Sequence, residues 1–133
     1  MLMVKTEKKE NRFQGGLQYI GEYRGVRAAV IFDTEGLIID HWEKDGLDIE
    51  IFSPLMLSML SNINAVLKKL GEQPANIAVV KNKDSWLTVH RVGELIMAVI
   101  AEIETDDLLR VRINQAAEMI KDHMQEKYPL LFR

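Results

Sequence analysis

The chain has 133 residues, a net charge of −3 and a hydrophobic fraction of 47%. This length suits one domain, and the hydrophobic fraction supplies a core, so a disordered chain is excluded. Cysteine is absent, which excludes thiolate catalysis, cysteine-ligated zinc and disulfide bonds. The acidic balance argues against nonspecific nucleic-acid binding, which needs basic residues to neutralise phosphates. We expect a cytoplasmic location, and no apolar run is long enough to predict a membrane span.

Hydrophobic periodicity predicts eight elements in the order helix, two strands, helix, three strands, helix. They cover residues 11–23, Val26–Asp33, Leu37–Trp42, Asp48–Leu70, Asn76–Lys81, Ser85–Val92, Glu94–Ile103 and a final helix from Thr105 or Asp106 to Tyr128. The first and fifth strands are apolar on both faces, which predicts central positions in the sheet. Tight turns predict a mainly antiparallel sheet, and apolar strand faces predict helices on both sides. We expect a flexible tail over residues 1–10, one domain over 11–128 and a second tail over 129–133.

The start of the long helix has two interpretations. In one, Ser53 is the N-cap and Pro54 occupies the first turn. In the other, Asp48 is the cap and Pro54 lies inside the helix with a mild kink. Gly71 is a natural end for the helix in both cases.

The long helix carries more apolar surface than one sheet face can cover. On a helical wheel, Met56, Leu60, Ile63, Leu67 and Leu70 form a stripe that we expect to face the core. Further apolar residues widen the arc to about 200°, with only Ser53 and Asn64 as polar members. Exposure of the surplus would create a patch that needs a partner. We therefore predict a self-association surface or a partner interface; burial of this helix on more sides is the alternative.

No motif for catalysis or for a bound cofactor is present. His41, His90 and His123 lack metal-binding spacing, and we expect each to be a half-exposed polar residue. The short acidic turns lack the ligand spacing of an EF-hand, and no glycine-rich phosphate loop or nucleophile elbow occurs. The acidic residues around position 105 are typical of a helix start, with a weak cation site as the alternative. Five basic residues could form a patch that steers an acidic protein partner: Lys68, Lys69, Lys81, Lys83 and Arg91.

The stretch from Gly25 to Ile39 resembles the first hairpin of the roadblock/dynein light chain family. The shared pattern is an apolar strand, an acidic turn that closes in glycine, and a second apolar strand. The order of elements is also similar over residues 11–126, and it is closest in type to the bacterial MglB-type branch. Pro54, early in the long helix, departs from the family pattern.

The resemblance implies a five-stranded antiparallel sheet, with the long helix on one face and the first and last helices on the other. It also implies a homodimer in which the third strands pair and the long helices pack together. A short apolar strand at a sheet edge is an aggregation hazard that such pairing removes. We expect these residues at the dimer interface: Phe52, Leu55, Met59, Val66, Ile77, Val79 and Val80.

The resemblance implies a non-catalytic regulator that binds a Ras-like small GTPase and modulates its GTP hydrolysis without an arginine finger. We expect these residues to face the GTPase: Ser58, Ser61, Asn62, Ala65, Lys68 and Lys69. No cofactor or metal is predicted. A passive scaffold and a small-ligand sensor of the PAS or GAF type remain as alternatives, and the sensor would need a roomy pocket with convergent polar groups.

Overall fold

The computed structural model describes residues 15–44, 46–102 and 107–127. A helical segment over residues 15–21 leads into the following elements. They are β1 (Val26–Asp33), β2 (Ile38–Glu43), α2 (Ile49–Lys69), β3 (Ile77–Lys81), β4 (Ser85–Val92), β5 (Leu95–Glu102) and α3 (Asp107–Lys127). The predicted strands are confirmed, with ends that differ by at most one residue.

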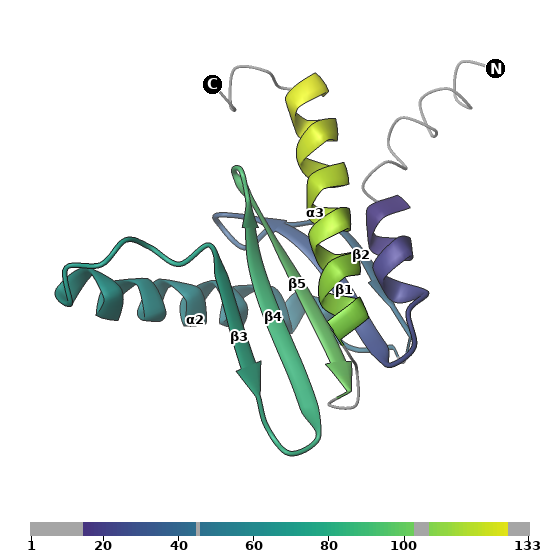
Figure 1. Ribbon diagram of the computed structural model, residues 1–133, viewed down its shortest axis with the longest axis horizontal. Helices are drawn as coiled ribbons and strands as arrows, with labels where there is room; N and C mark the ends of the chain where they lie inside the picture. The colour runs from purple at the N-terminus through teal and green to yellow at the C-terminus, as the bar shows by residue number, and fades with distance from the viewer. Residues whose placement is uncertain (1–14, 45, 103–106, 128–133) are drawn as a thin grey trace.

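The five strands form one antiparallel sheet in the order β2-β1-β5-β4-β3. β1 and β5 are central, as their two-sided apolar patterns predicted, and β2 and β3 are the edges. The helix α2 lies on one face, and α3 and the N-terminal helical segment lie on the other (Figure 1). This confirms the predicted α+β sandwich.

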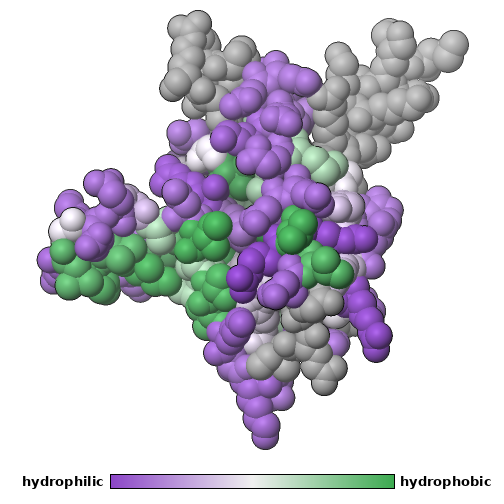
Figure 2. Space-filling model, in the orientation of Figure 1, coloured by the Kyte–Doolittle hydropathy of each residue, from purple (hydrophilic) through white to green (hydrophobic). Residues whose placement is uncertain are grey.

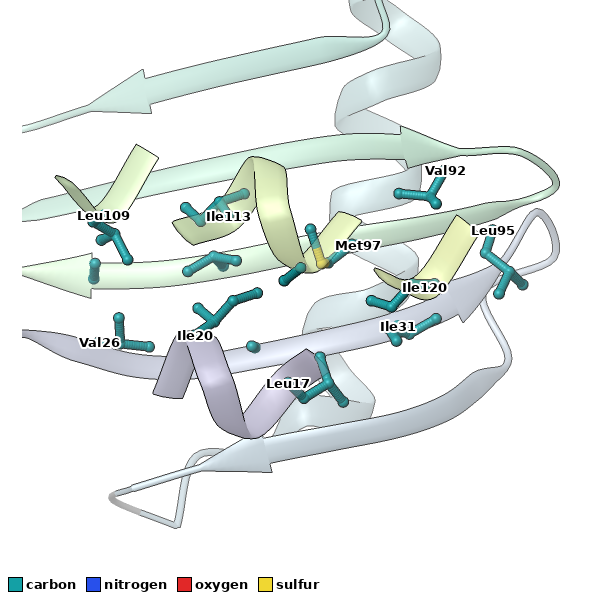
Figure 3. Close-up of a cluster of buried hydrophobic side chains, with 14 of the residues drawn as sticks. Leu17, Ile20, Val26, Ile31, Val92, Leu95, Met97, Leu109, Ile113 and Ile120 are labelled. Atoms are coloured by element: carbon teal, nitrogen blue, oxygen red, sulfur yellow. The ribbon is translucent and has the colours of Figure 1, made fainter. Parts of the chain in front are cut away.

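The larger core lies between the sheet and the pair formed by α3 and the N-terminal segment. Leu17 and Ile20 of that segment, with Leu109, Ile113 and Ile120 of α3, converge on β1 and β5 (Figure 3). All five side chains are buried. The apolar stripe of α3 that contains Leu109, Ile113 and Ile120 therefore faces the core.

Aromatic and polar contacts fasten the N-terminal segment to α3. The guanidinium of Arg112 lies 4.6 Å from the ring centroid of Tyr19 and 5.1 Å from that of Tyr23. Arg112 also donates to the Tyr19 carbonyl at 2.9 Å, and Tyr19 Oη donates to Gln115 Oε1 at 2.5 Å. The flank of α3 that carries Arg112 and Gln115 therefore packs against this segment.

The smaller core lies under α2. Ile49, Met56 and Leu60 pack against residues of β1, β4 and β5. Asp48 occupies the N-cap position without a side-chain cap bond, and Pro54 lies inside the helix. The interpretation with Ser53 as N-cap is therefore wrong, because the buried Ser53 hydroxyl instead donates to the Gly36 carbonyl at 2.9 Å.

The C-terminal end of α2 is closed by a Schellman motif. The amide of Gly71 donates to the Lys68 carbonyl, and the amide of Glu72 donates to the Leu67 carbonyl. Gly71 has φ +78°, a conformation that glycine adopts without a Cβ penalty. The predicted end of the helix is confirmed.

Some predictions lie outside the described residues. These are the two tails, the start of the first helix over 11–14, and residues 103–106 and 128 at the ends of the last strand and helix. The first helix ends at residue 21, two residues earlier than predicted, where a turn leads into β1.

Candidate functional site: a self-association surface

Among the described residues, the last turns of α2 lie beyond the edge of the sheet (Figure 1). All buried residues of this helix lie between Ile49 and Leu60. Beyond that point the helix projects past the β3 edge of the sheet (Figure 1). Val66 and Leu70 are consequently 59% and 69% exposed.

This projection corrects one part of the predicted core-facing stripe. Met56 and Leu60 are buried as expected, but Leu70 is largely exposed, and Ile63 and Leu67 are half-buried. The helical period was right, but the sheet ends before the helix does.

The apolar side chains of α2 follow a heptad pattern along one flank. Phe52, Met59 and Val66 recur every seven residues, and Met56, Ile63 and Leu70 fill the alternate positions. Such 3–4 spacing is typical of a helix that pairs with another helix. We call these six residues the α2 flank. Of these six, the predicted interface includes Phe52, Met59 and Val66.

An apolar groove of about 300 Å³ lies beside the α2 flank on the same face of the sheet. Phe52 and Met56 form one side, and Val80, Leu87 and Ile100 of three strands contribute to the rest. The groove thus lies next to β3, on the side toward which α2 projects.

The two edges of the sheet are built differently. On β2, the carboxylate of Asp40 accepts a hydrogen bond from the amide of His41 at 2.8 Å, and a register shift opposite Ile31 and Phe32 disturbs the β1 pairing. Charge and irregularity of this kind protect an edge against pairing. On β3, Ile77, Val79 and Val80 are 51%, 45% and 43% exposed. On β2 one large apolar residue, Ile39, is exposed to a similar degree at 44%, so β3 is the more apolar of the two edges and the one that the resemblance implied.

The two polar residues within the apolar arc of α2 form hydrogen bonds inside the protomer. Ser53 binds the Gly36 carbonyl, and Asn64 Oδ1 accepts a hydrogen bond from the Ala75 amide at 2.8 Å. Asn64 thereby holds the segment that returns from α2 to β3. Neither residue interrupts the α2 flank.

The residues that we expected to face a GTPase all lie exposed on α2. They are Ser58, Ser61, Asn62, Ala65, Lys68 and Lys69. They form the polar side of the helix, and none is buried or held in a geometry suited to chemistry. We call them the α2 polar strip.

The histidines differ from the prediction. His41 is exposed, but His90 and His123 are each 6% exposed, because His90 lies under the α3 layer and His123 on the buried side of α3. Burial lowers the pKa of His90, since desolvation disfavours the imidazolium. Among the described residues, no group of His, Asp or Glu side chains could hold a metal ion.

The basic residues do not form one patch. Lys81 pairs with Trp86, whose side chain lies in the core under α3, whereas Arg91 pairs with Ile96 of the core under α2. Paired residues share a face of the sheet, so Lys81 and Arg91 point to opposite faces.

The helix α2 meets the length and composition expected of a membrane-crossing helix, which the sequence analysis did not anticipate. This is weak evidence, since apolar helices of soluble proteins have the same properties. Here Ser53, Met56 and Leu60 are packed on the sheet, and of the exposed apolar residues Val66 and Leu70 lie on the α2 flank while Ile51 lies outside it.

Comparisons with known proteins place this surface in context. The family model described as Roadblock/LC7 domain matches residues 17–101. A comparison with curated proteins found no match.

Solved structures share the fold at low sequence identity. The gliding protein MglB from Thermus thermophilus has a TM-score of 0.79 and 18% identity, covering 89% of this chain and 92% of that chain. A structure described as MglB with tetrameric arrangement has a TM-score of 0.80 and 20% identity, covering 89% and 91%. MglB of Myxococcus xanthus has a TM-score of 0.75 and 16% identity, covering 90% and 96%.

Proposed function

Because the chain belongs to the Roadblock/LC7 family, we propose that it forms a homodimer that binds a Ras-like small GTPase and modulates its GTP hydrolysis. Family membership supports a soluble, non-catalytic protein with a regulatory or adaptor role in a small-GTPase pathway. The proposal adds the dimer, the GTPase contact and a cytoplasmic location. One observation carries it: among the described residues, the α2 flank continues past the β3 edge of the sheet, where Val66 and Leu70 are largely exposed.

A two-fold axis at β3, perpendicular to the sheet, would give a partner to the exposed β3 edge and to the projecting half of α2. It pairs β3 with its twin in antiparallel fashion and extends the sheet across the two protomers. It also puts the projecting half of each α2 over the strands of the other protomer. Val66 and Leu70 of one copy then lie near the apolar groove of its partner.

Hydrophobic burial gives this contact its driving force. Leu55, Val66 and Leu70 are each more than half exposed, and burying a large aliphatic side chain contributes about 1.5–3 kcal/mol. When β3 pairs with its twin, the side chains of Ile77 and Val79 also lose part of their exposed surface to the neighbouring strand. A protein described as MglB with tetrameric arrangement shows that an assembly is compatible with this fold.

The α2 polar strip is our candidate for the GTPase contact. Two-fold packing through the α2 flank leaves this strip exposed on the outer side of both helices. It offers hydroxyl, amide and ammonium groups, and it contains no acid–base pair or nucleophile with an activating partner. A change in hydrolysis rate would therefore come from the positioning of the GTPase's own residues.

The test mixes the purified protein with a small GTPase encoded beside it in the source genome. We expect a complex in size-exclusion chromatography with light scattering and a changed rate of GTP hydrolysis. Binding with an unchanged rate would make the protein an adaptor only. Absence of any complex would contradict the proposal.

Lys68→Glu combined with Lys69→Glu should weaken the complex and leave the dimer mass unchanged. The control is Lys83→Glu in the β3–β4 turn, which makes one such charge reversal away from the α2 polar strip. Equal losses from both variants would argue against this strip as the contact.

A further inference from the structure

We propose that the dimer binds an acidic amphipathic helix in a trough on the α3 side of the sheet, at the junction of the two protomers. This inference rests on the proposed self-association, because one protomer carries only half of the trough. It concerns the face opposite to α2 and its polar strip.

The floor of the trough comes from β3. Ile77 and Val79 pair with His90 and Thr88 of β4, so these side chains point to the α3 side. They remain 51% and 45% exposed, since α3 packs over β4 and not over β3. Figure 2 shows hydrophobic side chains gathered over this edge, close to those of the projecting α2.

The wall comes from the flank of α3 that faces β3. Arg112 and Gln115 contact Tyr19, so that flank of α3 faces the N-terminal segment. The opposite flank, half a turn around the helix, carries Arg110 and Lys121. Both side chains are exposed.

The exposed charges on this flank are mainly basic, with Asp107 in the first turn of α3 as an acidic exception. Lys81 continues the basic lining, because it pairs with Trp86 and so points to the α3 side. The exposed acidic residues Glu118 and Asp122 lie on the outer side of α3, away from β3. The chain as a whole carries a net charge of −3, so this basic character is not a general property of its surface.

A two-fold axis at β3 doubles these features around a central apolar strip. Ile77, Val79 and their twins form the floor, and an α3 helix stands on each side with Arg110 and Lys121. An apolar floor between two basic walls fits a helix with one apolar face and acidic flanks. The N-terminal residues of this chain do not suit the trough, because residues 1–14 contain four basic and two acidic side chains and the walls are basic.

The experiment uses a fluorescein-labelled synthetic helix of about 20 residues, with leucine along one face and glutamate elsewhere. A second peptide carries lysine at every glutamate position. Light scattering first establishes the mass of the full-length protein, and fluorescence anisotropy then measures binding. We expect the dimer to bind the glutamate peptide at least about tenfold more tightly than the lysine peptide, with weakening as salt rises.

Arg110→Glu with Lys121→Glu should reduce the affinity by about tenfold or more and leave the dimer mass unchanged. Arg110→Gln with Lys121→Gln is the milder variant, with a smaller loss in the same direction. Arg24→Glu, an exposed basic residue near the N-terminal segment, is the control that should bind normally.

The outcomes are separable from those of the proposed function. A dimer that binds neither peptide, or both equally, overturns the trough and leaves self-association intact. A monomeric wild type overturns both. Binding to phosphatidylserine vesicles without peptide binding would assign the basic face to a lipid surface and would overturn the proposed helix.

Discussion

Gly21 shows how closely two elements approach at a single residue. A Cβ built on Gly21 would lie 2.3 Å from the ring of Trp42 on β2, far inside van der Waals contact. The close packing of the N-terminal segment against the sheet therefore depends on the missing side chain.

Gly21→Ala should lower the free energy of unfolding by about 1–3 kcal/mol, because the added methyl group overpacks against a rigid indole. Chemical denaturation monitored by circular dichroism would measure this. Gly15→Ala is the matched control: no atom of the described residues lies within 4 Å of its Cβ position, and alanine is the better helix former. If both variants melt alike, the Gly21 contact is not as close as described.

The burial of His90 predicts a pH dependence of stability. Its pKa is lowered in the folded state, so the unfolded chain takes up a proton first as the pH falls below about 6.5. Stability should be fully present above that value and should decrease on acidification until the folded-state pKa is reached. His90→Gln should lose less stability over this window than the wild type, as measured by denaturant titrations at several pH values. Parallel pH profiles would show that His90 does not contribute.

Apolar side chains of α2 pack on the sheet, and one buried polar contact adds to them. The Ser53 hydroxyl donates to the carbonyl of Gly36 in the β1–β2 turn, and Ser53 is only 1% exposed. This bond determines where the first half of α2 lies on the hairpin.

Ser53→Ala should cost about 1–3 kcal/mol of folding stability, because it leaves the Gly36 carbonyl without this donor. Thermal unfolding would measure the loss. Ser58→Ala, at an exposed position of the same helix, should change stability by less than about 0.5 kcal/mol. A neutral Ser53→Ala would mean that another donor replaces the hydroxyl.

The arrangement of the whole molecule predicts which variants change its mass. Met59→Glu places a carboxylate at the centre of the α2 flank, where pairing would bury it without a partner. We expect a shift from dimer to monomer in light scattering.

Ser61→Glu adds the same charge at an exposed position of the α2 polar strip and should leave the mass unchanged. Circular dichroism of both variants separates lost pairing from lost folding, since Met59 also contacts the core under α2. A folded Met59→Glu dimer would contradict the proposed interface.

Much of the candidate site could be predicted from the sequence, and its gaps have a physical cause. The wide apolar arc of α2 led us to expect Phe52, Leu55, Met59 and Val66 at an interface, and it assigned Ile63 and Leu70 to the core, where Leu70 is in fact exposed. A wheel reports the angle of each residue about the helix and not how far the sheet extends beneath it. The contact with a second copy and the GTPase-facing role of the polar strip remain predictions.

Local periodicity by itself determined the elements, their order and the central places of β1 and β5, because apolar spacing directly reflects which faces are buried. The roadblock resemblance is confirmed by the family model over residues 17–101. Only the tertiary structure showed that α2 extends beyond the sheet and that His90 is buried. It also showed that β2 is an irregular edge strand, whereas β3 is an exposed edge strand to which another strand can pair. These properties depend on where separate elements end relative to one another, and that relation is set by packing across the whole fold.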